Sequence, residues 1–212
     1  GMMNRMYVPR FLDKLISLYR NNDRIFKFLH MPVQSGSERI LRKMKRGHTA
    51  RIFLDVVKEL REKIPEITIA TDIITGFPSE SEKDFEETLS LVEESQPDVI
   101  NSSKYSPRPG TVASKYPKIN TAIVKERSTR LHDTIKKTLM SRNRIWHGWR
   151  GEILVDEILE NNKIQGRNYA YKPVIVDLQG NQKFASKQLL GHYLSVKVEK
   201  VSKYSLLGEL MS

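Results

Sequence analysis

Apolar positions along the first two-thirds of the chain alternate between helical spacing and short β-rich runs. The helical spacing predicts helices at residues 7–19, 35–46, 49–64, 79–96 and 120–144. The short apolar runs predict strands at residues 25–31, 67–75 and 98–105. Three strand–helix units in series are typical of a parallel sheet with right-handed crossovers.

Helix starts are marked by hydroxyl residues followed by acidic ones. Ser35 with Glu38, and Ser79 with Glu82, fit the capping-box spacing, and Thr49 is the expected first cap of the helix between them. These signals place each helix directly after a strand and a short loop. The expected fold class is therefore α/β. Because a complete (β/α)₈ barrel takes about 250 residues, three such units make a partial barrel.

The pattern changes after Trp149, where glycines become frequent and no long helix is indicated. Short strands are predicted at 152–159, 171–178 and 194–201. About 60–70 residues of this kind predict a small all-β barrel of OB-like character. We therefore expect two domains, residues 1–145 and 146–212.

Polar residues gather in three loops that follow the predicted strands, at 30–41, 71–89 and 105–117. In open and closed α/β sheets, loops at the carboxyl ends of parallel strands hold the ligands. Asp72 stands out because it lies in an otherwise apolar strand, where a carboxylate needs a partner. That partner is either an internal Lys or Arg or a ligand. Arg108 stands between two prolines that could aim its guanidinium into a pocket.

The first loop, with Gln34 and Ser35, could offer hydroxyls and backbone N–H groups to a ribose or an anion. A plain turn in which Ser35 caps the helix explains it equally well. His30 is interpreted as a hydrogen-bonded histidine rather than a catalyst. Gly76 permits close backbone approach to a flat ring.

A second candidate site lies in the β-rich region, between Gly166 and Pro173. Aromatic and basic residues alternate here in a way that suits RNA phosphates and bases, at Arg167, Asn168, Tyr169, Tyr171 and Lys172. The alternative is an ordinary strand with core tyrosines. Trp146 and Trp149 could stack on bases, although packing at the domain junction is the simpler interpretation.

Charge and cysteine content narrow the chemistry. The formal net charge of +11 favours a polyanionic partner. With no cysteine, disulfides, thiolate nucleophiles and thiolate-bound metals are excluded, and the five histidines show no metal-ligand spacing, so no metal site is expected. No apolar run reaches the length of a membrane span, and a cytoplasmic, membrane-free protein is expected.

The order and spacing of several motifs closely resemble the C-terminal half of radical-SAM methylthiotransferases. The motifs are HMPVQSGS from His30, KMKR from Lys43, TDIITGFP from Thr71, DFEETL from Asp84 and YSPRPGT from Tyr105. The last 67 residues resemble a TRAM domain, the small RNA-binding barrel that ends these enzymes. GRNYAYKPV is similar to the archaeal and eukaryotic branch, which acts on threonylcarbamoyl-adenosine next to the tRNA anticodon.

The resemblance implies a partial radical-SAM barrel, S-adenosyl-L-methionine (SAM) cleaved to a 5′-deoxyadenosyl radical, and [4Fe–4S] clusters. Their cysteine ligands are absent from this chain and would lie upstream of residue 1, in an N-terminal region that becomes a partner. Carried over by position, the cofactor-binding residues would be Gln34, Ser35, Asp72, Thr75, Gly76, Pro78, Tyr105, Ser106 and Arg108. The implied macromolecular partner is tRNA.

From this resemblance we expect a fragment that is inactive alone, because no residue can ligate a cluster, but that still binds tRNA in a salt-sensitive way. A stand-alone RNA-binding protein and a ribosomal-protein methylthiotransferase are the alternatives. A half-barrel would also expose a strand edge and apolar helix faces, so we expect self-association through that edge.

Overall fold

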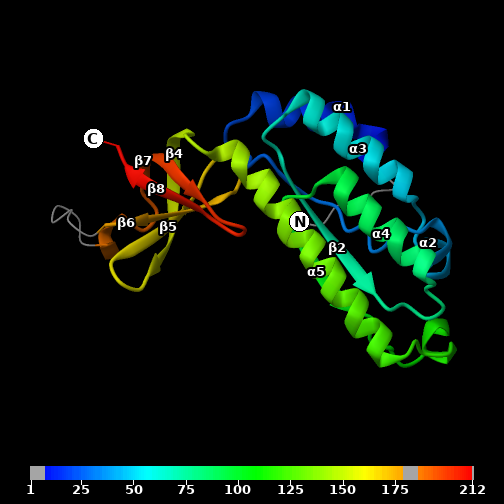
Figure 1. The fold of residues 1–212 in the computed structure, drawn as a ribbon. Coiled ribbons are helices and arrows are strands. Elements are labelled where there is room, and N and C mark those ends of the chain that lie inside the picture. The colour runs from blue at the N-terminus through cyan, green and yellow to red at the C-terminus, as the bar shows by residue number, and fades with distance from the viewer. Residues whose placement is uncertain (1–7, 179–185, 212) are drawn as a thin grey trace. The chain divides into compact units, whose positions relative to one another are not determined.

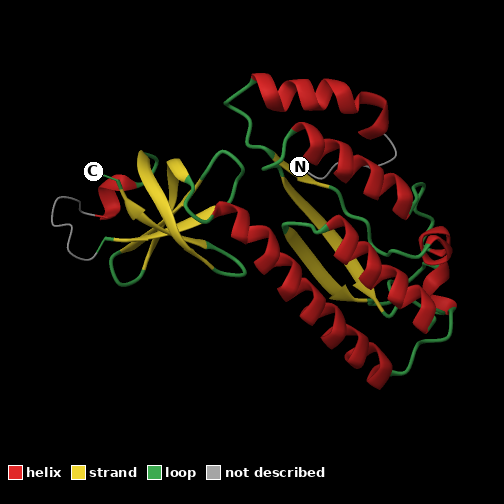
Figure 2. Ribbon diagram, turned by 45° about the horizontal axis from the view of Figure 1, so that its top comes forward, coloured by secondary structure: helices red, strands yellow, loops and turns green. Residues whose placement is uncertain are grey.

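The computed structural model describes residues 8–178 and 186–211, which fall into two compact units (Figures 1 and 2). The first unit contains residues up to 18 and 29–138; the second contains residues 19–28 and from 139 onward. This division differs from two linear domains meeting at residue 145, because the segment 19–28 joins the second unit. The linear domain boundary stays a prediction.

The first unit is a three-stranded sheet accompanied by helices. Its strands are β1 (Phe28–His30), β2 (Thr68–Thr75) and β3 (Val99–Lys104), in the order β1-β2-β3. The helices are α1 (Val8–Asn21), α2 (Glu38–Lys43), α3 (Ala50–Lys63), α4 (Glu82–Ser95) and α5 (Thr121–Asn143), with a 3-10 turn η1 (Val112–Lys115) before α5. Figures 1 and 2 show α3 and α4 running along the sheet.

β2 and β3 pair in parallel, and a parallel bridge between Gln34 and Ile73 extends the β1 side of the sheet. The two faces of β2 differ in their exposure to solvent. Ile69, Thr71, Ile73 and Thr75 are all buried, whereas Asp72 and Ile74, on the opposite face, are partly exposed. β3 repeats this asymmetry, with Asn101 and Ser103 exposed. One face of the sheet is therefore core, and the other is partly open to solvent.

Two of the predicted helix caps lie elsewhere in the structure. The N-cap of α2 is Ser37 rather than Ser35, and Glu38 accepts a hydrogen bond from the backbone N–H of Ala50 instead of closing a capping box. The capping box of α4 is Ser81 with Asp84, two residues later than predicted. Thr49 caps α3 as predicted, accepting from the Ile52 N–H. The Ser37 hydroxyl donates to Asp84 and does not cap α2, so tertiary partners decide at which serine each helix begins.

The second unit is a closed five-stranded barrel in the order β4-β5-β6-β8-β7. The strands are β4 (Arg150–Leu159), β5 (Lys163–Arg167), β6 (Pro173–Asp177), β7 (Tyr193–Val201) and β8 (Leu206–Leu210), with 3-10 turns η2 (Arg144–Trp146) and η3 (Ser186–Leu189). β5 and β8 were not predicted, because each is short and shows little alternation. Ile153, Val174 and Val196 are fully buried in the barrel core, together with Trp146.

Segment 19–28 is held to the barrel unit by specific bonds. The backbone N–H of Lys27 donates to the carbonyl of Tyr169 at 2.8 Å, and the rings of Phe26 and Phe28 pack against the Tyr171 ring. Within the segment, the Tyr19 hydroxyl donates to the Phe28 carbonyl at 2.8 Å. Among the described residues, no helix has both the length and the hydropathy needed to cross a bilayer.

Candidate functional site

A row of polar side chains crosses all three strands on the open face of the sheet. His30 Nε2 lies 2.9 Å from Asp72 Oδ1, and Asn101 Nδ2 donates to the same oxygen at 3.0 Å. The parallel register, which sets Asp72 opposite Asn101, produces this alignment. Asp72 thus has His30 and Asn101 as hydrogen-bond partners rather than the Lys or Arg that the sequence suggested.

In this row, the second carboxylate oxygen of Asp72, Oδ2, is available to a ligand. Both donors contact Oδ1 of Asp72, and no described residue hydrogen-bonds Oδ2. About a quarter of the Asp72 side chain (24%) is exposed, as is 20% of His30, so the site is accessible from the open face. A fixed carboxylate of this kind accepts hydrogen bonds from hydroxyl or amino groups, such as those of a nucleoside. Sequence reasoning did not identify Asn101; only the pairing of β2 with β3 places it here.

The carboxyl ends of β2 and β3 form a second, adjoining group. The Tyr105 N–H donates to the Thr75 carbonyl at 2.8 Å, and the Tyr105 ring packs edge-on against Phe77 with centroids 5.2 Å apart. The Tyr105 hydroxyl is buried and has no hydrogen-bond partner among the described residues. A buried, unpaired hydroxyl costs roughly 1–3 kcal/mol, so a ligand that pairs with it gains that amount.

Gly76 is needed here for its backbone. Its φ is +78°, and a Cβ at this position would lie 2.8 Å from both methyl groups of Val124. The Cβ side of Gly76 is therefore packed against Val124 of α5. Pro78 and Thr75 are buried beside it.

A buried ion pair secures this loop to α5. Arg127 Nη1 donates to Glu80 Oε2 at 3.0 Å and to the Glu80 backbone carbonyl at 3.0 Å. Glu80 Oε2 also accepts a hydrogen bond from the Gly76 N–H at 3.0 Å. Both side chains are almost fully buried, 5% exposed for Arg127 and 1% for Glu80. Burial raises the pKa of Glu80 above its ordinary value, although the Gly76 N–H and Arg127 oppose this.

The loop after β1 is tied mainly to α4. Ser35 is fully buried, and its hydroxyl contacts the Thr88 hydroxyl at 3.2 Å and accepts from the Ser37 N–H. Gly36 is obligatory, because a Cβ there would lie 2.2 Å from the Glu87 carbonyl oxygen. Ser35 thus has a structural role in this chain. Gln34 has a left-handed φ of 70° and is nearly buried, and its backbone N–H donates to the Asp72 carbonyl.

Asp84 fixes the ends of α2 and α4 together. Burial would raise its pKa, but hydrogen bonds from Arg39, Ser37 and Ser81 outweigh burial and hold the pKa of Asp84 well below its ordinary value. This network therefore links the loop before α2 to the loop before α4.

The remaining predicted site residues separate into exposed and buried sets. Ser106 and Arg108 are exposed in the loop after β3. In the barrel unit, Tyr169 and Tyr171 are exposed by 36% and 39%, and Arg167 lies over the Tyr171 ring. Asn168 and Lys172 are buried instead. The first hydrogen-bonds its own turn, and the second donates to Asn143 Oδ1 at 2.9 Å.

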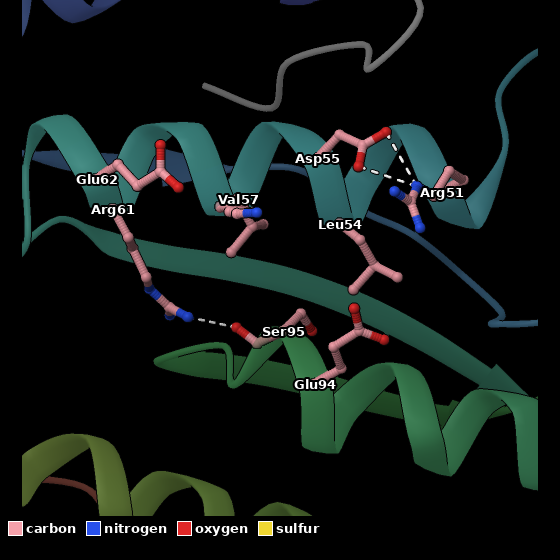
Figure 3. Close-up of a pocket in the computed structure, with 9 residues that line it drawn as sticks. Arg51, Leu54, Asp55, Val57, Arg61, Glu62, Glu94 and Ser95 are labelled. Atoms are coloured by element: carbon pink, nitrogen blue, oxygen red, sulfur yellow. Dashed lines mark hydrogen bonds and ion pairs between the residues drawn. The ribbon is translucent and has the colours of Figure 1, made fainter.

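A surface groove of about 500 Å³ lies between α3 and α4, away from the strand ends (Figure 3). Two arginines of its lining, Arg51 and Arg61, are already paired. Arg61 donates to the Ser95 carbonyl and contacts Asp98 at 3.2 Å, and Arg51 pairs with Asp55 at 3.0 Å. Both arginines are thus engaged within the fold, and we place the candidate site on the open face of the sheet, where two donors orient the Asp72 carboxylate.

The residues of this chain do not fit an iron–sulfur cluster. The sequence contains no cysteine. The described residues also contain no group of three or more histidine, aspartate or glutamate side chains arranged to hold a metal ion. A nucleoside ligand fits better, given the oriented Asp72 carboxylate and the orphaned Tyr105 hydroxyl.

The chain is similar in sequence to radical SAM proteins and to tRNA methylthiotransferases. Residues 1–92 match the model of the radical SAM superfamily. A Pyrococcus abyssi protein named "Probable threonylcarbamoyladenosine tRNA methylthiotransferase" is 39% identical over 212 residues, covering 100% of this chain and 48% of that protein. The "Threonylcarbamoyladenosine tRNA methylthiotransferase" of Drosophila pseudoobscura pseudoobscura is 38% identical over 100% of this chain and 36% of its own length.

A second named activity also occurs among the relatives. The "tRNA-2-methylthio-N(6)-dimethylallyladenosine synthase" of Vibrio parahaemolyticus is 37% identical over 95% of this chain and 42% of that protein. Among solved structures, the radical SAM enzyme coproporphyrinogen III oxidase of Escherichia coli shares the fold with a TM-score of 0.51 at 14% identity, over 94% of this chain and 49% of that one. The chain spans about half the length, or less, of the curated relatives it matches.

Proposed function

The chain belongs to the family of radical-SAM tRNA methylthiotransferases, and from this premise we propose that its first unit contributes part of the barrel that holds SAM and the target nucleoside. We propose further that its second unit is a TRAM domain that binds tRNA. The cofactor and substrate residues are those of the open sheet face and the adjoining strand ends. The domain assignment is 1–145 and 146–212, with segment 19–28 added to the second unit.

The observation that carries the proposal is the polar row of His30, Asp72 and Asn101. In an α/β barrel the helices cover the outer face of the sheet, and ligands lie at the carboxyl ends of the strands. The row occupies the uncovered face, and the His30 and Asn101 side chains orient its carboxylate. In this arrangement Asp72 Oδ2 accepts a hydrogen bond from a ribose hydroxyl or from an exocyclic amine of the nucleoside.

We propose that residues of this chain hold SAM and that residues outside these 212 hold the iron–sulfur clusters. SAM, when bound, supplies the adenosyl and methyl groups, and Asp72, Asn101 and Tyr105 are the residues proposed to hold or orient it. Thr75, Gly76 and Pro78 shape the wall of the same site, and Ser106 and Arg108 border its mouth. The clusters require cysteines that these 212 residues lack, so the chain alone is proposed to be inactive.

The proposed substrate is N6-threonylcarbamoyl-adenosine next to the tRNA anticodon, because the four archaeal relatives and the Drosophila relative carry that name. The formal net charge of +11 favours binding to a polyanion such as tRNA. The Vibrio relatives act, by name, on dimethylallyladenosine, which makes that nucleoside the natural competitor in a substrate assay.

A chimaera tests the proposal. The part of the Pyrococcus abyssi protein that precedes the aligned region is joined to this chain, and tRNA carrying threonylcarbamoyl-adenosine is treated with SAM and a reductant. Nucleoside mass spectrometry is expected to detect the methylthio product. Asp72→Asn should reduce product formation roughly tenfold or more, the cost of about one charged hydrogen bond. Asp55→Asn, a change of the same kind on an exposed helix face, should not.

Two outcomes oppose the proposal. If the chimaera folds and carries its clusters but modifies only dimethylallyladenosine, the substrate assignment is wrong. If Asp72→Asn modifies tRNA as fast as the parent chimaera, the polar row is not part of the site.

A further inference from the structure

A strip of aromatic and basic side chains forms on the second unit from two segments far apart in sequence. Phe26 and Lys27 come from segment 19–28, and Arg167, Tyr169 and Tyr171 come from the end of β5 and the turn after it. The Lys27 N–H donates to the Tyr169 carbonyl at 2.8 Å, and the Phe26 and Tyr171 rings lie 5.0 Å apart between centroids. We call these five residues the aromatic strip.

The rings of the aromatic strip are exposed, and cations are positioned over them. Phe26, Tyr169 and Tyr171 are 37%, 36% and 39% exposed. Lys27 Nζ lies 4.8 Å from the Tyr169 centroid, and Arg167 Cζ lies 4.8 Å from the Tyr171 centroid. Arg167 is held in place by Asp156, which contacts its Nε at 2.7 Å, so its terminal nitrogens remain able to donate. Three neighbouring exposed rings with two cations are typical of an interaction surface.

The turn that carries Tyr171 is strained, and buried residues maintain the strain. Tyr171 has a φ of +62°, a conformation that costs a bulky residue roughly 1–2 kcal/mol and favours Gly or Asn. The fully buried Asn168 accepts from the Ala170 and Lys172 N–H groups, and Lys172 is anchored to Asn143. The backbone conformation alone favours a Gly at position 171. The tyrosine instead places a ring against Phe26 and Phe28, with centroids 5.0 Å and 5.3 Å away, and leaves 39% of the residue exposed.

We propose that the aromatic strip is a stacking platform for unpaired RNA nucleotides, with Lys27 and Arg167 contacting the flanking phosphates. Aromatic faces stack on any unpaired base, and adjacent cations bind the backbone that connects them. A duplex hides its base faces, so the strip distinguishes looped-out or single-stranded nucleotides from paired ones. The inference rests on the proposed function for the identity of the RNA, and it adds Phe26 and Lys27, which lie outside the β-barrel sequence, to the RNA-binding set.

Anisotropy of fluorescein-labelled RNA, with the full chain, tests the proposal. The probes are a short single-stranded RNA and a blunt duplex of the same length. Tyr171→Leu preserves apolar contact with Phe26 but removes the stacking face, and Tyr171→Phe preserves both. We expect Tyr171→Leu to weaken single-strand binding roughly tenfold and Tyr171→Phe to bind like the unmodified chain. Tyr204→Leu, at a tyrosine of the same unit that is 64% exposed and lies outside the aromatic strip, is the control and should have no effect.

Charge and fluorescence give two further readouts. Lys27→Met should reduce the slope of log affinity against log salt by about one unit, because one phosphate contact is lost. Lys200→Met, at an exposed lysine of the same unit outside the aromatic strip, should leave the slope unchanged. Both tryptophans of the chain belong to this unit, and the Trp149 ring lies 6.1 Å from Tyr169. Bases stacked on the strip should therefore quench tryptophan emission, and the duplex should not.

Each outcome supports or overturns the proposal. Equal affinities for Tyr171→Leu and Tyr171→Phe, equal binding of duplex and single strand, or no RNA binding by the unmodified chain would overturn it. An acidic peptide of equal charge that binds as tightly through the same rings would also overturn it, in favour of a protein partner. Strip-dependent binding of single strands without any binding of tRNA supports the platform and contradicts the proposed function. Binding of tRNA that no strip variant changes overturns the platform alone.

Discussion

Replacing Arg127 with methionine should destabilise the first unit strongly, because it leaves the Glu80 carboxylate buried without its cation. Arg127 and Glu80 are 5% and 1% exposed, and two Arg127 contacts to Glu80 lie at 3.0 Å. Removing one partner of such a pair typically costs 3–5 kcal/mol. The contact of Arg127 with the exposed Glu82 adds little to this loss. For a unit of this size the expected decrease in melting temperature is roughly 6–20 °C.

The loss should depend on pH with a defined sign. Burial already raises the pKa of Glu80 in the folded chain, and removing Arg127 raises it further. A carboxyl whose folded pKa exceeds its unfolded value contributes stability below the unfolded pKa and loses it as pH rises through the folded one. The Arg127→Met variant should therefore be less stable at pH 8 than at pH 5, relative to the parent chain.

A double variant separates the buried charge from the lost packing. Glu80→Gln preserves an oxygen that can accept the Gly76 N–H, now 3.0 Å from Glu80 Oε2, but carries no charge. Glu80→Gln combined with Arg127→Met should therefore recover more than half of the stability lost in the single variant, and it should lose the pH dependence.

Two optical probes distinguish the units during urea unfolding. Ellipticity at the helical minimum reports mainly on the first unit, which contains almost all the helices, and tryptophan emission reports on the second. The Arg127→Met variant should shift the first transition alone. A loss below about 1 kcal/mol at pH 8, or a double variant no more stable than the single one, would refute the reasoning about the buried charge.

Three further predictions concern other contacts. Because hydrogen bonds hold the pKa of Asp84 below the ordinary value of 3.8, the stability that Asp84 contributes should be present above about pH 4 and should be lost as pH decreases below it; acid titration of Asp84→Asn should show a flatter profile. Burial raises the pKa of Tyr19 to about 12, so stability should fall between about pH 10 and 12 and Tyr19→Phe should abolish that fall, as followed by alkaline absorbance titration. Gly36→Ala should cost roughly 1–3 kcal/mol in thermal melts, because its Cβ meets the Glu87 carbonyl at 2.2 Å.

The α/β order of the first unit could be predicted because local patterns define it. The apolar run at 67–75 became β2, and the helical spacing at 120–144 became α5. The positions of the caps could not be predicted as well. Ser35, Ser37, Ser79 and Ser81 are chemically equivalent in sequence, and only Asp84, reached from both loops, selects Ser37 and Ser81.

The candidate site was predictable in outline only. The apolar surroundings of Asp72 showed that it needs a partner, but not that His30 and Asn101 provide it, since strand register is a property of the sheet. In the same way, the sequence suggested that Asn168 and Lys172 contact RNA, whereas the fold buries both to support the turn at Tyr171. The order of residue types along the chain does not show which polar side chains form hydrogen bonds within a turn instead of contacting a ligand.

The sequence alone determined the strand–helix series, the change to a β-rich region, the absence of cysteine ligands and the positive charge, because each depends on residue type and local spacing. The tertiary structure alone decided which residues meet. Parallel pairing of β2 with β3 brought Asn101 to Asp72, and packing against the barrel brought Phe26 and Lys27 beside Tyr171 and Tyr169, from more than 140 positions away. Contacts across such separations depend on register and packing, which no local pattern specifies.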